Sequence, residues 1–166
     1  MAPPRAKYPV SRMSQLRDRI MQSPREATVV RECAHMIESF LSGAGGMKGF
    51  TLRSALHTAQ RARPDLLEQS SRRLLPEFLD ALDPYYQKWD PSTEPDFAAQ
   101  LMRHEDAACD AVLAVADARA QRSSNRVVTS IYSRMRGGAR KDVERVFPEL
   151  ATLIARELNT QNREAD

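Results

Sequence analysis

The stretch that decides the fold is Arg73-Leu74-Leu75-Pro76-Glu77-Phe78-Leu79-Asp80-Ala81-Leu82, because the chain repeats its pattern. Seventy-two positions later the sequence reads Arg145-Val146-Phe147-Pro148-Glu149-Leu150-Ala151-Thr152-Leu153-Ile154. Both copies place a basic residue, two large apolar residues and Pro-Glu ahead of a further apolar run. The repeat predicts two similar halves, at about residues 24–84 and 96–158. The repeat by itself does not indicate a catalytic or binding activity.

Apolar residues recur at helical spacing along most of the chain. Val29, Cys33 and Ile37 follow the i, i+4, i+8 positions of one helix face, and Phe50 and Leu56 are expected on the inner side of the next helix. β-Branched residues form no alternating runs of the kind that strands need. At 166 residues the chain fits one domain. We therefore predict an all-α domain, a compact bundle of six or seven helices.

Pro76 and Pro148 fall inside the apolar stripes of two predicted helices. A proline within a helix removes one backbone hydrogen bond and clashes with the preceding turn, at a cost of about 3 kcal/mol. Either each helix kinks, or a new helix begins near the proline. We predict kinked helices at both positions.

Domain boundaries follow from composition. Residues 1–10 hold three prolines without periodicity, which predicts a flexible arm ahead of a single helical domain at 11–158. Pro84 and the Trp89–Pro95 segment are expected to link the halves. One helix is predicted from Asp96 to Arg122, and residues 159–166 are expected to form a frayed tail.

Neither a membrane span nor a secretory signal is visible in the sequence. No stretch approaches the roughly 20 apolar residues that cross a bilayer, and Met1-Ala2-Pro3-Pro4-Arg5-Ala6-Lys7 lacks the apolar segment of a signal peptide. Cys33 and Cys109 lie on apolar faces and are expected to be small buried hydrophobes. The sequence predicts a cytoplasmic protein.

The formal net charge of +3 conceals segregation of the charges along the chain. Residues 1–31 hold seven Lys or Arg against two Asp or Glu, and residues 76–110 hold two against nine. Residues 115–145 hold eight against three. Segments of opposite charge can meet across an interface, so the pattern favours a protein that associates with partners or with itself.

Eight basic side chains flank the Gly137-Gly138 break and form the candidate face for an anionic partner. They are Arg119, Arg122, Arg126, Arg134, Arg136, Arg140, Lys141 and Arg145. Helices with basic faces around a turn can contact phosphates, so nucleic-acid binding is one hypothesis. The other hypothesis is a solvated face that pairs with the acidic 76–110 region, within or between subunits.

Two histidine-containing stretches resemble metal motifs and are interpreted as ordinary surface residues. Glu32-Cys33-Ala34-His35 has the Glu-x-x-His spacing, but a di-iron bundle needs that motif twice. The repeat partner, His104-Glu105-Asp106-Ala107, has no histidine at the position equivalent to His35. It also lacks the second histidine of a zinc-protease helix. We predict no metal and no cofactor.

The glycine-rich segment Gly43-Ala44-Gly45-Gly46-Met47-Lys48-Gly49 lacks the Gly-Lys-Ser/Thr order of a phosphate loop. A helix end with a hinge is the preferred interpretation. An anion held by the free amides of the following helix stays open. No serine, cysteine or threonine lies in a recognisable nucleophile motif, and the three histidines suggest no acid–base pair, so we predict that the protein is not an enzyme.

Three stretches together resemble an uncharacterised bacterial all-helical family, a domain of unknown function. They are Leu75-Pro76-Glu77-Phe78, then Val115-Ala116-Asp117-Ala118-Arg119-Ala120 with Arg122-Ser123-Ser124, and Tyr132-Ser133-Arg134-Met135-Arg136-Gly137. The resemblance covers about residues 26–158 and implies an intracellular bacterial protein. It implies no activity, cofactor or catalytic residue. The leading hypothesis is a non-enzymatic interaction or scaffold domain that self-associates through unidentified protein contacts, and the alternative is nucleic-acid binding through the 119–145 face.

Overall fold

The computed structural model describes residues 14–22 and 24–165, and these residues form helices without any strand. The helices are α1 (Gln15–Met21), α2 (Glu26–Gly43), α3 (Gly46–Ala62), α4 (Leu66–Gln87), α5 (Phe97–Arg103), α6 (Glu105–Arg122), α7 (Arg126–Met135), the 3₁₀ turn η1 (Arg136–Gly138) and α8 (Ala139–Ala165). The all-α prediction is confirmed. The predicted arm at 1–10 lies outside the described residues.

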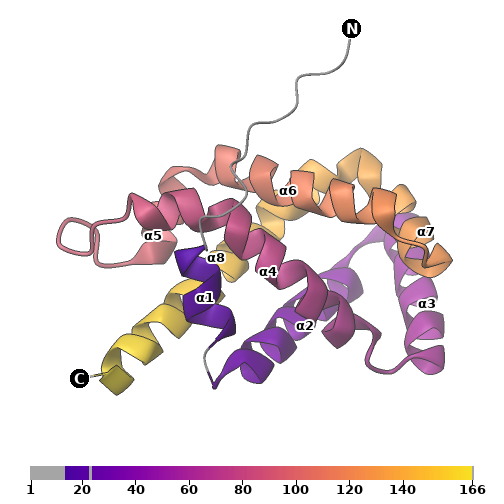
Figure 1. Ribbon diagram of the computed structural model, residues 1–166. Coiled ribbons are helices and arrows are strands. Elements are labelled where there is room, and N and C mark those ends of the chain that lie inside the picture. The colour runs from indigo at the N-terminus through magenta and orange to yellow at the C-terminus, as the bar shows by residue number, and fades with distance from the viewer. Residues whose placement is uncertain (1–13, 23, 166) are drawn as a thin grey trace, which may run out of the picture.

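Four long helices, α2, α4, α6 and α8, form the centre of the bundle (Figure 1). Both α4 and α8 pack against α2 and α6. The short helix α1 lies against α4, as α5 lies against α8. At one end of the molecule α3 and α7 lie side by side, away from α1 and α5.

The main hydrophobic core receives no side chain from α3 or α7. Its fully buried members come from α1, α2, α4, α5, α6 and α8, and include Leu16, Val29, Leu79, Phe97 and Ile154. Among the described residues, helix α3 buries Gly49 and the apolar side chains of Leu52, Leu56 and Ala59, and α7 buries none. The α3–α7 end is therefore packed less deeply than the rest of the bundle.

Local side-chain chemistry fixes several helix starts. Ser14, Asp96 and Asn125 each accept a hydrogen bond from a backbone N–H in the first turn of the helix that follows, which satisfies donors that the helix leaves free. Gly46, with a φ of 71°, begins α3 in a conformation that favours glycine. The glycine-rich segment is thus the turn between α2 and α3.

Two predicted boundaries differ from the structure. The helix expected over Asp96–Arg122 breaks at His104, whose φ of −116° and ψ of 26° are not helical. Helix α4 continues through Pro84 to Gln87, so the link between halves begins later than predicted. Apolar spacing misses the break because the spacing continues across His104. It misses the later end of α4 because packing can hold a helix in place around an exposed proline in its last turn.

The expected frayed tail is largely helical. Helix α8 runs past Leu158 to Ala165, and Gln161 Nε2 donates to the carbonyl of Arg19 at 2.8 Å while Arg19 Nη2 donates to Asn162 Oδ1 at 2.6 Å. The contact with α1 gives these polar residues partners that the sequence pattern could not reveal.

Pro76 and Pro148 both lie inside continuous helices, α4 and α8, so no helix begins at either proline. Their neighbours differ in depth, because Leu150 is buried while Phe78 is half-buried. Exchanging α1–α4 for α5–α8 leaves the main pattern of helix contacts unchanged. That pattern supports the internal repeat, which stays a prediction, as do the proline kinks.

Candidate functional site

Ion pairs with acidic residues occupy half of the predicted basic face. Arg119 and Arg122 both pair with Glu77 of α4, the first at 2.5 Å. Arg136 Nε lies 2.8 Å from Asp117 Oδ1. Arg140 reaches three carboxylates on its own helix and on α6, namely Asp106, Asp110 and Glu144, at 3.0–3.3 Å.

The other four cations, Arg126, Arg134, Lys141 and Arg145, are exposed and form no ion pair with the residues that the structure describes. Arg126 and Arg134 belong to α7, and Lys141 and Arg145 belong to α8. The structure therefore divides the predicted face into four cations with ion pairs and four without. Helix α7, which lies next to α3, carries two of the four without.

A groove of about 630 Å³ runs between α3 and α7, and we call it with its rim the α3/α7 face. Small side chains such as Ser54, Ala55 and Ala62 line it, with Arg126 and Arg134 on the α7 side. The exposed large hydrophobic side chains of the described residues gather on the same two helices: Met47 is 90% exposed, Phe50 68% and Val127 42%.

The prediction that Phe50 faces the core is wrong. The inner positions of α3 are Leu52, Leu56 and Ala59, and Phe50 lies on the groove. Sequence spacing could not separate the two faces, since apolar residues occur on both. A usable signal was the absence of carboxylates, because neither α3 nor α7 contains Asp or Glu.

An apolar cavity of about 290 Å³ lies between α2, α3, α4, α6, α7 and α8. Its walls include Phe40, Leu67, Leu113, Ile131 and Val146, all half-buried. Few polar side chains reach it. Helical spacing of apolar residues indicates no cavity, because periodicity reports the direction of a side chain and not how well helices fill the space between them.

A second hollow, of about 310 Å³, adjoins the cavity between α4, α6 and α7. Four arginines line it, Arg63, Arg73, Arg119 and Arg122. At its border the hydroxyl of Tyr132 donates to Asp117. Burial and this bond raise the pKa of Tyr132 to about 12. Two of the four arginines, Arg63 and Arg73, do not belong to the predicted face because they lie about 50 positions before it in the sequence.

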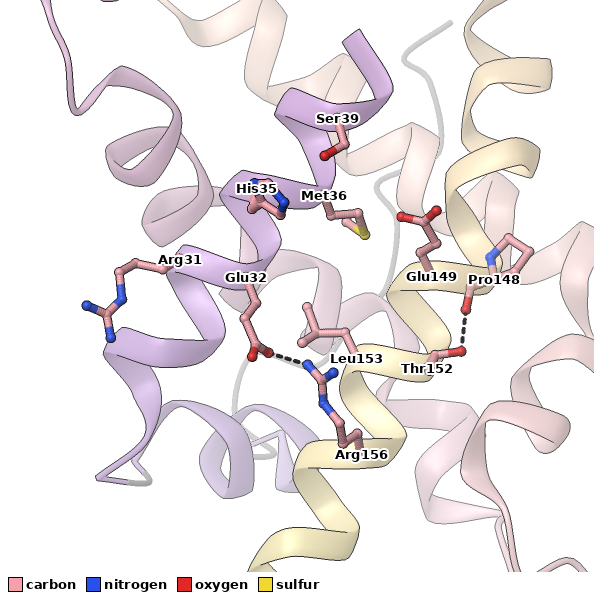
Figure 2. Close-up of a pocket in the computed structure, with 10 residues that line it drawn as sticks. All are labelled: Arg31, Glu32, His35, Met36, Ser39, Pro148, Glu149, Thr152, Leu153 and Arg156. Atoms are coloured by element: carbon pink, nitrogen blue, oxygen red, sulfur yellow. Dashed lines mark hydrogen bonds and ion pairs between the residues drawn. The ribbon is translucent and has the colours of Figure 1, made fainter. Parts of the chain in front are cut away.

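A groove of about 870 Å³ lies between α2 and α8, and Glu32 and His35 of the Glu-x-x-His stretch line it (Figure 2). Glu32 and Arg156 face each other across it as an ion pair. His35 lies on one wall and Glu149 on the other, and Arg31 extends away from the groove. The part of the chain that the structure describes holds no group of three His, Cys, Asp or Glu side chains able to hold a metal ion.

Comparisons with known proteins identify one family. A model described as a family of unknown function (DUF6918) matches residues 16–158. No curated protein and no solved structure matches the chain. Over the described ranges, no helix combines the length and the apolar composition needed to cross a membrane.

Proposed function

We propose that this chain, which belongs to the DUF6918 family, is a non-enzymatic protein-interaction domain that binds its partners through the α3/α7 face. The proposal is carried by the exposed Phe50 and Val127, which line one groove, together with the exposed Met47 on the first turn of α3. Apolar side chains exposed together mark interaction sites more often than scattered ones do. The small residues along the groove leave room for a partner helix to approach closely.

The charge of the face indicates the chemistry of its partner. Helices α3 and α7 have basic side chains and no acidic ones, and Arg126 and Arg134 flank the groove without ion pairs among the described residues. Electrostatic complementarity calls for a partner that presents carboxylates beside apolar side chains.

A second copy of the chain can supply the carboxylates. Residues 76–110 hold nine Asp or Glu against two Lys or Arg. A two-fold contact between two α3/α7 faces would bring like charges together, which is unfavourable. The proposed self-association therefore joins the α3/α7 face of one copy to the acidic region of the next.

Sedimentation velocity over a range of protein concentrations, at low and high salt, tests this proposal. We expect wild type to associate, and salt to weaken the association because it screens exposed charges. Two double variants, Met47→Ser with Phe50→Ser and Arg126→Ser with Arg134→Ser, should each weaken association at least tenfold.

Lys141→Ser with Arg145→Ser is the matched control, because it also removes two exposed cations that have no ion pair with the described residues. It should leave association unchanged. A strict monomer at both salt concentrations would contradict self-association. Equal weakening by the control and by Arg126→Ser with Arg134→Ser would show that net charge matters and the α3/α7 face does not.

Nucleic-acid binding is the second candidate, and the exposed ring of Phe50 beside Arg126 and Arg134 favours it. Aromatic side chains stack on bases, and arginines bind phosphates. A mobility-shift titration of duplex DNA over a range of salt distinguishes it, since log K falls with a slope of roughly −0.9 per phosphate contact. Arg126→Ser with Arg134→Ser should flatten that slope by nearly two units. No shift at low salt would eliminate this candidate.

A cytoplasmic location is part of the proposal. The thiols of Cys33 and Cys109 are free and buried, which suits a reducing compartment. Fractionation of the native cells, with detection of the protein in the soluble or the membrane fraction, is the direct check.

A further inference from the structure

We propose that the apolar cavity and the arginine-lined hollow form one binding site for an amphiphile with a hydrocarbon tail and an anionic head. The two spaces share part of their walls, and the shared residues are Leu66, Ser70, Leu74, Ala116, Val128 and Tyr132. In the proposed complex the ligand extends past these shared residues from one space into the other. The proposed site shares Ile131 with the lining of the α3/α7 groove, but it takes a different kind of ligand and does not depend on the proposed protein interaction.

The cavity suits a hydrocarbon tail. Its volume of about 290 Å³ is roughly twice that of an engineered apolar cavity of about 150 Å³ that stays dry and binds benzene. Half-buried walls such as Leu113 and Ile131 gain from contact with a tail, because transfer of apolar surface out of water is favourable. A ligand that fills the cavity also gives these wall side chains the dispersion contacts that they lack on the cavity side.

The hollow suits an anionic head. Arg63 and Arg73 form no ion pair with the residues that the structure describes, and Arg119 has a buried Nε without a hydrogen-bond partner. Arg119 and Arg122 share the single carboxylate of Glu77, so the four guanidinium groups keep an excess of positive charge. Their planar donors match the oxygens of a carboxylate or a phosphate.

The start of α7 adds to the attraction for an anion. Ser123, Ser124 and Asn125 line the hollow where α7 begins. The first turn of a helix presents the positive end of its dipole. Ser70 of α4 and Ala116 of α6 are small side chains on the walls that the two spaces share, and we place the passage for the ligand there.

Isothermal titration calorimetry and thermal unfolding of the full chain with dodecanoate, below its micelle concentration, test the site. We expect saturable binding and a raised midpoint of unfolding. Dodecyl phosphate distinguishes the two anionic heads, because tighter binding than dodecanoate would identify a phosphate head and weaker binding a carboxylate. Dodecyltrimethylammonium carries the same tail with a cationic head and should bind at least tenfold more weakly. Acetate, a head without a tail, should not bind.

Variants separate the two parts of the site. Arg63→Ser with Arg73→Ser should weaken dodecanoate at least tenfold, whereas Arg31→Ser with Arg145→Ser, which removes two exposed arginines elsewhere, should not. Ala116→Phe should block the passage, and Val128→Phe provides a second obstruction should Ala116→Phe not fold.

Three results would overturn the proposal. Dodecanoate could fail to bind wild type, the cationic and anionic amphiphiles could bind equally, or folded obstructed variants could bind like wild type. None of these results would bear on sedimentation of variants in the α3/α7 face, so the two proposals fail independently.

Discussion

Burial sets the chemistry of the two thiols. Cys33 and Cys109 are free and almost fully covered, and loss of solvation raises the pKa of each to about 11. A thiol reacts as its thiolate. Both cysteines therefore behave as small apolar core residues, as the sequence predicts from their positions on apolar helix faces.

The first prediction concerns thiol reactivity. At pH 8 neither Cys33 nor Cys109 should react with Ellman's reagent in the folded protein, because the raised pKa leaves little thiolate and burial blocks access. Both should react at once in concentrated urea, which serves as the control. Rapid modification of one or both thiols in the folded protein would show that a thiol is accessible.

The second prediction concerns Tyr132 and alkaline pH. Its pKa is raised to about 12 in the fold, against about 10 in an unfolded chain. Its contribution to stability is therefore complete below pH 10 and is lost as pH rises through 12. Urea unfolding between pH 9 and 12 should show a smaller loss for Tyr132→Phe than for wild type.

The buried thiols, whose pKa values are also raised, do not confound this comparison because both proteins contain them. Parallel loss of stability in the two proteins would exclude Tyr132 as a source of the pH dependence.

At the scale of elements, the turn between α2 and α3 holds the α3/α7 face in place. Gly46, whose φ is 71°, lets the chain reverse, and Gly49 lies so close to the turn that a Cβ there would be 2.0 Å from the carbonyl oxygen of Ala44. The same oxygen accepts a hydrogen bond from Arg53. Backbone cannot move easily at that point.

The third prediction compares two glycines. Gly49→Ala should destabilise the protein by about 2–3 kcal/mol, since backbone must shift to relieve the clash. Gly137→Ala, where a Cβ meets nothing within 4 Å, should be neutral or stabilising by about 0.4–1 kcal/mol. Urea unfolding measures both. Equal effects would show that the α2–α3 turn relaxes freely.

At the scale of the whole molecule, packing is uneven. One end of α4 places Leu79 and Leu82 in a fully buried core, and its other end places Leu74 on the wall of the apolar cavity. The cavity separates α3 and α7 from the main core, which has no member on either helix. This arrangement leaves α3 and α7 available for contacts with other molecules.

The fourth prediction tests that unevenness with the same substitution on one helix. Leu79→Ala should cost about 3–5 kcal/mol, because it opens a void among side chains that cannot collapse. Leu74→Ala should cost less than about 2 kcal/mol, since this side chain already borders a cavity. Urea midpoints at constant m-value report the difference. Similar costs would mean that Leu74 is packed as closely as Leu79 and does not border a cavity.

Charge is also organised across the whole molecule. Arg17 pairs with Asp80 at 2.8 Å, and Arg140 reaches Asp106 and Asp110. Parts of the basic 1–31 and 115–145 segments thus lie against the acidic 76–110 segment within one chain. Exposed pairs of this kind contribute little to stability. Their main effect is on the surface charge, because they neutralise some cations and leave others, among them Arg126 and Arg134, to interact with other molecules.

The sequence by itself determined the fold class, most of the helices and the turns at the glycines. These depend on properties of neighbouring residues: helical spacing of Val29, Cys33 and Ile37, the capping oxygen of Asn125, and the freedom of Gly46. Local chemistry also identified both cysteines as core residues. Such features can be predicted because the physical cause and its effect lie within a few positions of each other.

Only the tertiary structure decided which side chains meet. The offset of 72 between the prolines does not hold for α2 and α6, which begin at Glu26 and Glu105, so helix pairing could not be extended from the repeated stretch. Half of the predicted basic face is neutralised by residues that are distant in sequence, such as Glu77. The walls of the apolar cavity and of the adjoining arginine-lined hollow come from α2, α3, α4, α6, α7 and α8. How completely helices fill the space between them depends on all of their side chains at once, and no single stretch of sequence contains that information.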